Sequence, residues 1–430
     1  MTERQPLYKL IYFNARGRAE HIRYIFAYAG IDYVDERILK ECWPELKKSM
    51  PYGMLPVLEI NGKPIAQSNA VARYLARKHN LTGRDEWEAM MCDVLVDTLG
   101  DLKQFISQYR IEEDLFKKKE KKMKLLKETI PFYLNKFEQI ISENGSYTVG
   151  TTTTWADFVF AVALENFENI FGTMALENYP GLRALKKRVH EIPSIVNWLS
   201  KRPHTEFGRV LLLFHFTNLI RNFYLYSKMS TYKLTYFPVK GLGEPIRFLL
   251  SYAGISFEDE RFDRDDWPKI KPTTPFGQVP VLDVDGKKIA QSVAISRYLA
   301  KKSGLAGKDD WEALEIDSIV DTIHDVRARL AAFHYEENEE IKAAKRKIAD
   351  EVVPYYLERL DAQVKNNGGY FVGGALSWAD LSFVALLDYL NFMNGSDLIE
   401  KYDNLKQLKE KVLNLPAIKS WLDKRPHSDF

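Results

Sequence analysis

A tyrosine near the end of a short alternating segment is the first candidate for chemistry. The segment reads Tyr8-Lys-Leu-Ile-Tyr-Phe13, and on a strand Tyr12 faces the side opposite Ile11. Its hydroxyl could donate a hydrogen bond to an anion that develops during a reaction. The alternative is that the ring only packs in a core. The same residue type recurs as Tyr236 in the strand-like segment 232–237.

The pair Gln67-Ser68 stands where a strand is expected to end and a helix to begin. A helix N-terminus offers free N–H groups and the positive end of the helix dipole, so it can bind a carboxylate. The alternative is an ordinary serine N-cap, which only stabilises the helix. The pair recurs as Gln291-Ser292.

Two more features of the first half could bind a ligand. Pro56 precedes a strand and is a candidate cis-proline that would expose the backbone of Leu55, with a trans proline at a strand start as the alternative. Trp43 and Lys47 are four residues apart, so they share one face of a short helix and could clamp a carboxylate. Otherwise they are a chance surface pair.

The chain contains none of the common sequence motifs for metal, nucleophilic-serine or nucleotide chemistry. It has no C-x2-C or H-E-x-x-H pattern, so no metal site is expected. It also lacks G-x-S-x-G and the Walker loop. The glycine spacing in "RGRAE" and "KGLGE" does not match a dinucleotide-binding turn.

The elements around these residues predict a small sheet followed by helices. Strands are expected at 8–13 and 33–38, with a helix between them that closes at Gly30. Asn61-Gly62 between two apolar runs predicts a hairpin, and Ser68 then opens a helix. From about Trp87 onward the pattern is helical, with long stretches near 87–109 and 117–143. Capping boxes are expected at Thr154/Asp157 and Ser377/Asp380.

The whole arrangement is written twice. Tyr12 and Tyr236 are separated by 224 residues, as are Trp43 and Trp267, whereas Trp155 and Trp378 are separated by 223. A period this long indicates a duplicated domain pair, not a solenoid. We therefore expect five segments: α/β units at 1–83 and 232–307, all-helical units at 84–207 and 308–430, and a connection at 208–231.

The connection leaves two interpretations open. Residues 208–228 have no acidic residue, no proline and one glycine, so they resemble neither flexible nor stiff linkers. They are either a linker helix or strand packed on a domain, or read-through between two adjacent genes. The second interpretation makes Met229 a genuine start.

Composition narrows the expected partners and compartment. The net charge of +2 suggests neither nucleic acid nor an anionic membrane as a partner. The two cysteines, Cys42 and Cys92, form no disulfide framework and suit a reducing compartment. The first residues contain no apolar core of a secretory signal, so a cytoplasmic location is expected.

Taken together, these residues resemble one known family. Five segments of the first copy and their counterparts in the second copy are similar to sigma-class glutathione S-transferases. These segments are "YKLIYFNARGRAEHIRYIFAYAG", "WPELKKSMPYG", "AQSNAVARYLARK", "VDTLGDL" and "WADF". That class includes haematopoietic prostaglandin D synthases and many arthropod enzymes. The resemblance covers 8–207 and 232–430. It implies, in each copy, a thioredoxin-like N-terminal domain followed by an all-helical C-terminal domain.

The resemblance also implies a role for each candidate residue. Tyr12 and Tyr236 would be catalytic and hydrogen-bond the glutathione sulfur, which favours the nucleophilic thiolate. Glutathione, as co-substrate, would be bound in the first copy by Arg18, Trp43, Lys47, Leu55, Pro56, Gln67, Ser68 and Asp101. In the second copy it would be bound by Trp267, Lys271, Val279, Pro280, Gln291, Ser292 and Asp325. Each of the two aspartates would reach the neighbouring subunit's site.

Departures from the family pattern shape the expected activity. Leu242 replaces Arg18 in the second copy, and Gly100 and His324 break an acidic pair associated with the synthases. Gln108 and Ala332 stand where the synthases carry a pocket tryptophan. The expectation is therefore conjugation of glutathione to small hydrophobic electrophiles, including lipid-peroxidation aldehydes, or peroxide reduction, in a homodimer or internal pseudo-dimer. The alternatives are a glutathione-dependent isomerase and a non-enzymatic crystallin-like protein.

Overall fold

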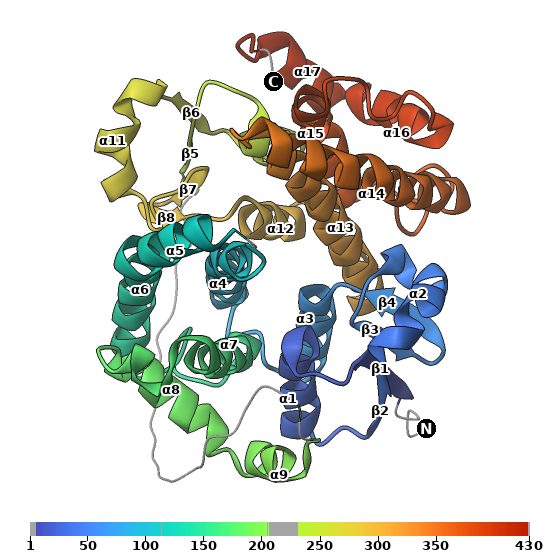
Figure 1. The fold of residues 1–430 in the computed structure, drawn as a ribbon. Coiled ribbons are helices and arrows are strands. Elements are labelled where there is room, and N and C mark those ends of the chain that lie inside the picture. Colours follow the sequence, from blue (N-terminus) through green and yellow to red (C-terminus); the bar gives the residue numbers. More distant parts are fainter. Residues whose placement is uncertain (1–5, 113, 204, 206–230, 429–430) are drawn as a thin grey trace. The chain divides into compact units, whose positions relative to one another are not determined.

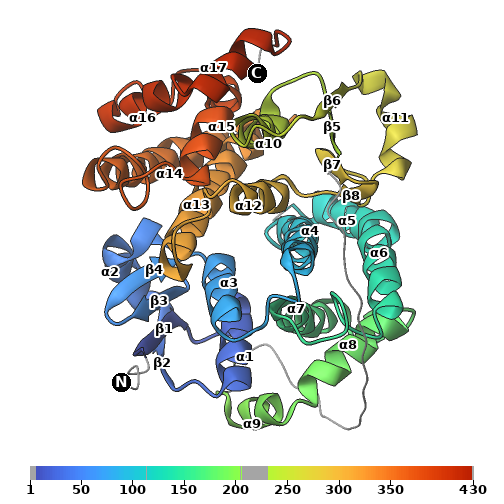
Figure 2. The same cartoon turned by 180° about the vertical axis from the view of Figure 1, so that it is seen from behind.

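A computed structural model describes residues 6–112, 114–203, 205 and 231–428 (Figures 1 and 2). The expected connection at 208–228 and Met229 lie outside the described residues. The chain divides into two compact units whose boundary does not follow the repeat. Residues 45–57 and 64–70 of the first copy group with the second copy, and the rest of the first copy forms the other unit.

Each copy begins with a four-stranded mixed sheet, as the sequence predicts. The strand orders are β2-β1-β3-β4 and β6-β5-β7-β8. The strands of the first copy are β1 (Tyr8–Phe13), β2 (Tyr33–Ile38), β3 (Val57–Ile60) and β4 (Lys63–Ala66). Those of the second copy are β5 (Tyr232–Tyr236), β6 (Glu258–Arg261), β7 (Val281–Val284) and β8 (Lys287–Ile289). In each sheet the first two strands run parallel.

Turn residues explain why these strands form where they do. Asn61-Gly62 and Asp285-Gly286 have positive φ at both positions, which the predicted two-residue hairpin requires. The Asn61 side chain accepts a hydrogen bond from the Leu7 N–H at 2.9 Å. Gly30 ends the first long helix in the left-handed conformation, with φ 65°, as expected for a C-cap.

The helices of the first copy alternate with short turns. They are α1 (Glu20–Ala29), α2 (Trp43–Leu46), α3 (Ser68–Lys78), α4 (Glu86–Arg110), α5 (Leu115–Lys124), α6 (Ile130–Glu143), α7 (Trp155–Phe171), α8 (Pro180–His190) and α9 (Pro193–Lys201). The helical stretch expected near 117–143 is confirmed, but it contains a π-helical turn that was not expected. A π-helical turn, Leu125–Thr129, separates α5 from α6 just before Pro131, whose missing N–H removes one bond of the regular ladder.

The helices of the second copy follow the same order. They are α10 (Glu244–Tyr252), α11 (Trp267–Ile270), α12 (Ser292–Lys302), α13 (Asp310–His334), α14 (Glu339–Asn366), α15 (Trp378–Asn394), α16 (Asp403–Leu413) and α17 (Pro416–Lys424). Both predicted capping boxes are confirmed, at the starts of α7 and α15.

The core of each helical region centres on its capped helix. Trp155 opens α7 and Trp378 opens α15, and each is about 1% exposed. The Trp155 N–H donates to the Leu81 carbonyl at 2.9 Å, which ties α7 to the chain that follows α3. Among the helices that the structure describes, none combines the length and apolar character needed to span a membrane.

Candidate active site

Strand register brings the candidate residues of the second copy to one end of its sheet. Thr235 pairs with Val281, so the next residues, Tyr236 and Pro280, lie side by side. Leu282 pairs with Ile289, so Gln291, two residues beyond β8, reaches the same end. Because β6 runs parallel to β5, the segment that leads to Trp267 also leaves from there. The candidate residues of the second copy therefore gather at one end of the sheet β6-β5-β7-β8.

The candidate tyrosines accept a backbone hydrogen bond in both copies. The Tyr236 hydroxyl accepts from the Leu242 N–H at 3.1 Å, and the Tyr12 hydroxyl accepts from the Arg18 N–H at 3.2 Å. Gly241 and Gly17 precede these donors, with φ of 41° and 43°. A Cβ at Gly241 would lie 2.8 Å from the Tyr236 oxygen, so a side chain there would crowd the hydroxyl. Each hydroxyl keeps its hydrogen for a ligand.

Burial keeps the Tyr236 hydroxyl neutral. Desolvation raises its pKa, and the Leu242 N–H and the charges of Arg247 and Arg327 only partly oppose that rise. A phenol whose pKa is raised stays protonated at neutral pH. Tyr236 can therefore donate a hydrogen bond but is a poor general base there.

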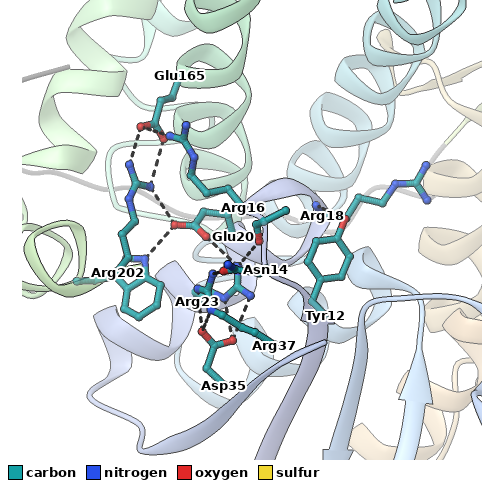
Figure 3. A network of polar contacts seen from close by, with 12 residues as sticks. Tyr12, Asn14, Arg16, Arg18, Glu20, Arg23, Asp35, Arg37, Glu165 and Arg202 are labelled. Carbon is teal, nitrogen blue, oxygen red and sulfur yellow. Dashed lines mark hydrogen bonds and ion pairs between the residues drawn. The ribbon is translucent and has the colours of Figure 1, made fainter. Parts of the chain in front are cut away.

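A buried polar network holds the loop that presents the Arg18 N–H (Figure 3). The Arg23 guanidinium donates to the Ala15 carbonyl at 3.0 Å and to Glu20 at 3.0 Å. Glu20 also accepts from the Trp198 indole N–H at 3.0 Å and from Arg202 at 2.9 Å. The network thus links the loop after β1 to α1 and to the end of the helical region.

The second copy repeats this network with small changes. Arg247 donates to the Val239 carbonyl at 2.9 Å and to Glu244 at 3.2 Å. Glu244 also accepts from Trp421 at 2.9 Å and from Arg425 at 2.7 Å. Sequence reasoning missed both networks. The available signal was a glutamate and an arginine three residues apart in each copy, in "RAEHIR" and "LGEPIR".

The Gln-Ser pairs occupy the predicted strand-to-helix junctions. Ser68 and Ser292 are the first residues of α3 and α12. Gln291, not the serine, is the N-cap of α12, and it has no side-chain capping bond. Both glutamines have positive φ, 74° for Gln67 and 73° for Gln291. The Gln291 side chain therefore does not cap the first N–H groups of α12. Binding of a ligand carboxylate at this helix N-terminus requires that those N–H groups are not already capped.

The remaining candidates lie on the loops between strands. The Leu55–Pro56 and Val279–Pro280 bonds are both cis, which confirms that expectation. Trp267 is half-buried and stacks on Phe262 with ring centroids 5.9 Å apart. Helix α11 ends at Ile270, and Lys271 opens the 3-10 turn that follows it, with an exposed side chain. Trp43 is half-buried and lies edge-on to Phe13. Lys47 is exposed.

Comparison with protein families identifies both halves of each copy. Residues 8–77 and 232–301 match the glutathione S-transferase N-terminal domain, and residues 100–202 and 324–425 match the C-terminal domain. A glutathione S-transferase of Anopheles gambiae is 49% identical over 199 residues, which are 46% of this chain and 98% of that protein.

The chain belongs to the glutathione S-transferase family.

Two other relatives narrow the subgroup. Glutathione S-transferase S1 of Drosophila melanogaster is 47% identical over 46% of this chain and 79% of its own length. Hematopoietic prostaglandin D synthase of Gallus gallus is 45% identical over 46% of this chain and 98% of its own length. The chain is thus a tandem pair of sigma-type transferase units, and family membership implies glutathione as co-substrate.

Within the second compact unit, candidate residues of the two copies contact each other. Gln67 Nε2 donates to Asp325 Oδ2 at 2.8 Å. A second contact joins the two copies in this unit, because Tyr356 donates its hydroxyl hydrogen to the Met54 sulfur at 3.2 Å. Burial raises the pKa of Tyr52, with a further contribution from the charge of Glu315. Segments 45–57 and 64–70 of the first transferase therefore share polar contacts with α13 and α14.

Three polar residues of the second helical region lie near the catalytic candidate and were missed from the sequence. The charge of Arg327 acts on the Tyr236 hydroxyl and also on Tyr389. The Tyr389 and Tyr335 hydroxyls are 3.0 Å apart. Arg327 Nε is buried without a hydrogen-bond partner among the described residues. These positions lie far from "YKLTYF" in sequence, so no local pattern indicated them.

A metal centre finds no support in the part of the chain that the structure describes. No group of three or more histidine, cysteine, aspartate or glutamate side chains comes together there. Burial and the neighbouring arginines Arg327 and Arg297 lower the pKa of His324 to about 3, which keeps its imidazole neutral at neutral pH.

Proposed function

We propose that each copy transfers the thiolate of glutathione to small hydrophobic electrophiles. The observation that carries this proposal is the tyrosine hydroxyl in each copy, which accepts a backbone N–H and keeps its own hydrogen. That hydrogen would be donated to a ligand atom, and a sulfur anion is the acceptor that the family chemistry supplies. Retention of the arrangement in both copies argues against a purely crystallin-like role.

The proposed reaction has two chemical steps. The glutathione S–H gives up its proton to solvent, and the tyrosine O–H hydrogen bond stabilises the sulfur anion. The thiolate then forms a carbon–sulfur bond with the electrophile, and a leaving group departs or the new carbanion is protonated. Because a free thiol has a pKa of roughly 8.5, one hydrogen bond to the anion shifts a useful fraction of it to thiolate at neutral pH.

Binding of the tripeptide is assigned to groups away from the sulfur. Gln67, Ser68, Gln291 and Ser292, at the starts of α3 and α12, would bind the γ-glutamyl carboxylate. The backbones of Leu55 and Val279, beside the cis prolines Pro56 and Pro280, would pair with the cysteinyl part. Trp43, Lys47, Trp267 and Lys271 would bind the glycine carboxylate. This division predicts that binding and chemistry can be separated by mutation.

Replacing the glutamines should weaken binding without slowing saturated turnover. We expect Gln67→Ala and Gln291→Ala to raise the KM for glutathione by about 10-fold, because each change removes one hydrogen bond to a charged group. The kcat at saturating glutathione should stay near that of the wild type. Steady-state kinetics of each variant measures both values, and a fall in kcat at constant KM would contradict the assignment.

For the second copy we propose electrophiles that carry a polar group, such as α,β-unsaturated aldehydes from lipid peroxidation. Arg327, Tyr335 and Tyr389 supply hydrogen-bond donors close to Tyr236, and the buried Arg327 Nε still needs an acceptor. Addition of sulfur to such an aldehyde develops negative charge on the carbonyl oxygen, which these donors can stabilise. The first copy has Lys103, Ile111 and Asn166 at the corresponding repeat positions.

A substrate comparison tests this pocket. We expect Arg327→Leu to lower kcat/KM for a 4-hydroxyalkenal by about 10-fold or more, because a donor to the developing oxyanion is lost. Activity toward a chloronitrobenzene, which lacks the carbonyl, should change much less. The matched control is Arg329→Leu, an exposed arginine on the same helix. Equal losses on both substrates would exclude a role in electrophile choice.

We also propose that the two copies pair as an internal pseudo-dimer or between chains. The Gln67–Asp325 hydrogen bond supports this, since the family resemblance assigns Asp101 and Asp325 to the neighbouring subunit's site. In this arrangement Asp325 would accept from Gln67 and from the γ-glutamyl amine of glutathione bound to the first copy.

A further inference from the structure

Helix α5 of the first copy and the turn after it form a strongly basic segment. Residues 115–129 contain seven lysines and two glutamates, so this short stretch carries a charge of +5 although the whole chain carries +2. We refer to residues 115–129 as the basic segment. The net charge of the whole chain, on which the expectation of no membrane partner rested, does not reveal this local excess of positive charge.

The basic segment is exposed along most of its length. Every residue from Lys119 to Lys124 is exposed, and Leu125, 4% exposed, is the one buried residue among the side chains that the structure describes in this segment. Large apolar side chains stand among the lysines: Phe116 is 72% exposed, Met123 46% and Leu126 40%. Burial of such apolar side chains against a partner lowers the free energy, because it removes them from water.

The apolar and basic residues share one side of the helix. Phe116, Lys119 and Met123 follow an i, i+3, i+7 spacing and so lie in one stripe along α5. Lysine stems can lie along an apolar surface while their ammonium groups reach outward. A helix with this pattern can lie flat at the boundary between lipid headgroups and acyl chains.

Local contacts hold the start of the helix in place without neutralising it. The Asp114 carboxylate caps α5 by accepting from the Phe116 and Lys117 N–H groups at 2.8 and 3.0 Å. Glu112 forms an ion pair with Lys121. Within the described residues, Lys119, Lys122 and Lys124 pair with no carboxylate. Their charges are therefore available to an anionic partner.

The second copy lacks the feature at the matching place. Residues 338–352, at the start of α14, contain four basic and four acidic residues. Three of the basic side chains form ion pairs there, Lys342 with Glu339, Lys345 with Glu336 and Arg346 with Asp350. The corresponding region is thus neutral and internally paired, so fold alone does not demand a basic segment.

We propose that the basic segment docks the protein on anionic phospholipid membranes. Unpaired lysines match the negative headgroups, each contributing about 1 kcal/mol near such a surface, and the exposed phenylalanine, methionine and leucine enter the interface. Nucleic acid would use the lysines but has no need of Met123 and Leu126 beside them, so lipid fits the whole pattern better. The first transferase unit would then lie at the membrane surface.

Vesicle sedimentation of the full chain tests this proposal. We expect binding to vesicles of phosphatidylcholine mixed with phosphatidylserine, loss of binding in high salt, and little binding to phosphatidylcholine alone. Replacing three lysines, as K119Q/K122Q/K124Q, should weaken binding about 100-fold, since each lysine accounts for about fivefold. Phe116→Ser should also weaken binding, with the lysines intact.

The neutral segment 338–352 of the second copy provides the matched control. K342Q/K345Q/K347Q removes the same charge from α14 and should leave vesicle binding unchanged. Thermal unfolding of all variants checks that the fold is kept. Equal vesicle binding by the wild type and the K119Q/K122Q/K124Q variant would overturn the proposal, as would equal binding to neutral and anionic vesicles. Binding to a DNA oligonucleotide or an acidic peptide, with none to the vesicles, would assign the segment to another class of partner.

Discussion

Removing the Tyr12 and Tyr236 hydroxyls is expected to raise the pKa of bound glutathione by roughly one to two units in each copy. A hydrogen bond to a charged acceptor is worth about 1.5–3 kcal/mol, and one pKa unit corresponds to about 1.4 kcal/mol. At neutral pH most of the thiolate in the affected site should therefore disappear. Ultraviolet difference titration of bound glutathione measures the thiol pKa directly.

The two copies make this experiment internally controlled. Tyr12→Phe and Tyr236→Phe should each remove the thiolate signal of one site, and the double variant should remove both. Glutathione affinity should stay nearly unchanged, because the hydroxyl acts on the sulfur and not on the carboxylates. Tyr24→Phe is the matched control, since it deletes a buried tyrosine hydroxyl that contacts His190 at 3.2 Å and is not a candidate site residue. An unchanged thiol pKa in the double variant would exclude the catalytic assignment.

The identity of the cation near each sulfur adds a second comparison. Arg18 is exposed, so water screens its charge, whereas Arg327 is half-buried and acts on the Tyr236 hydroxyl. From the sequence, the replacement of Arg18 by Leu242 predicted that the thiol pKa would differ between the two copies. The structure places a cation from α13 near Tyr236, so the absence of Arg18 does not leave that copy without positive charge.

Local chemistry explains why so much of the fold could be predicted. Asn61-Gly62 and Asp285-Gly286 specify hairpins because only such residues adopt positive φ cheaply at both positions. Thr154/Asp157 and Ser377/Asp380 cap α7 and α15 through contacts three residues apart. These features depend on neighbours in the chain. The π-helical turn at Leu125–Thr129 was missed, because the apolar pattern continues through it.

Tertiary contacts explain what could not be predicted. Gln67 and Asp325 are 258 residues apart, and no pattern along the chain indicates their hydrogen bond. Arg327 and Tyr389 lie on two different helices and act together only after α13 packs on α15. The buried glutamates, Glu20 and Glu244, stand in the first turns of α1 and α10, where acidic residues are common because of the helix dipole, so the local pattern does not indicate their burial.

Those glutamates lead to the second large expected effect. Glu20 and Glu244 are 0% and 1% exposed, and their arginine partners, Arg23 and Arg247, are fully buried. Glu20→Ala leaves the Arg23 cation without this carboxylate, and it removes the acceptor for Trp198 and one of the two carboxylates that Arg202 contacts. Removing one partner of a buried ion pair costs about 3–5 kcal/mol, so the transition of the first copy in urea should move to much lower concentration. The fluorescence of Trp198, which belongs to the network, measures this unfolding transition.

A milder variant and a surface variant separate the ion pair from general damage. Glu20→Gln keeps the shape and one acceptor oxygen, so its cost should be smaller than that of Glu20→Ala. Glu45→Ala, whose side chain is 87% exposed, should change stability by no more than about 0.5 kcal/mol. Glu244→Ala should repeat the effect in the second copy. If Glu20→Ala and Glu45→Ala unfold at the same urea concentration, the network does not stabilise the fold.

The same change should reach the chemistry through the loop after β1. Arg23 donates to both Glu20 and the Ala15 carbonyl, and that loop carries the Arg18 N–H to the Tyr12 hydroxyl. Without Glu20, the guanidinium keeps only Asp35 as a carboxylate partner, so its position against the loop and the orientation of the hydroxyl become less fixed. In the folded fraction of Glu20→Ala, the pKa of glutathione bound to the first copy should therefore rise, while the second copy keeps its thiolate. A stability loss with an unchanged thiol pKa would confine Glu20 to a structural role.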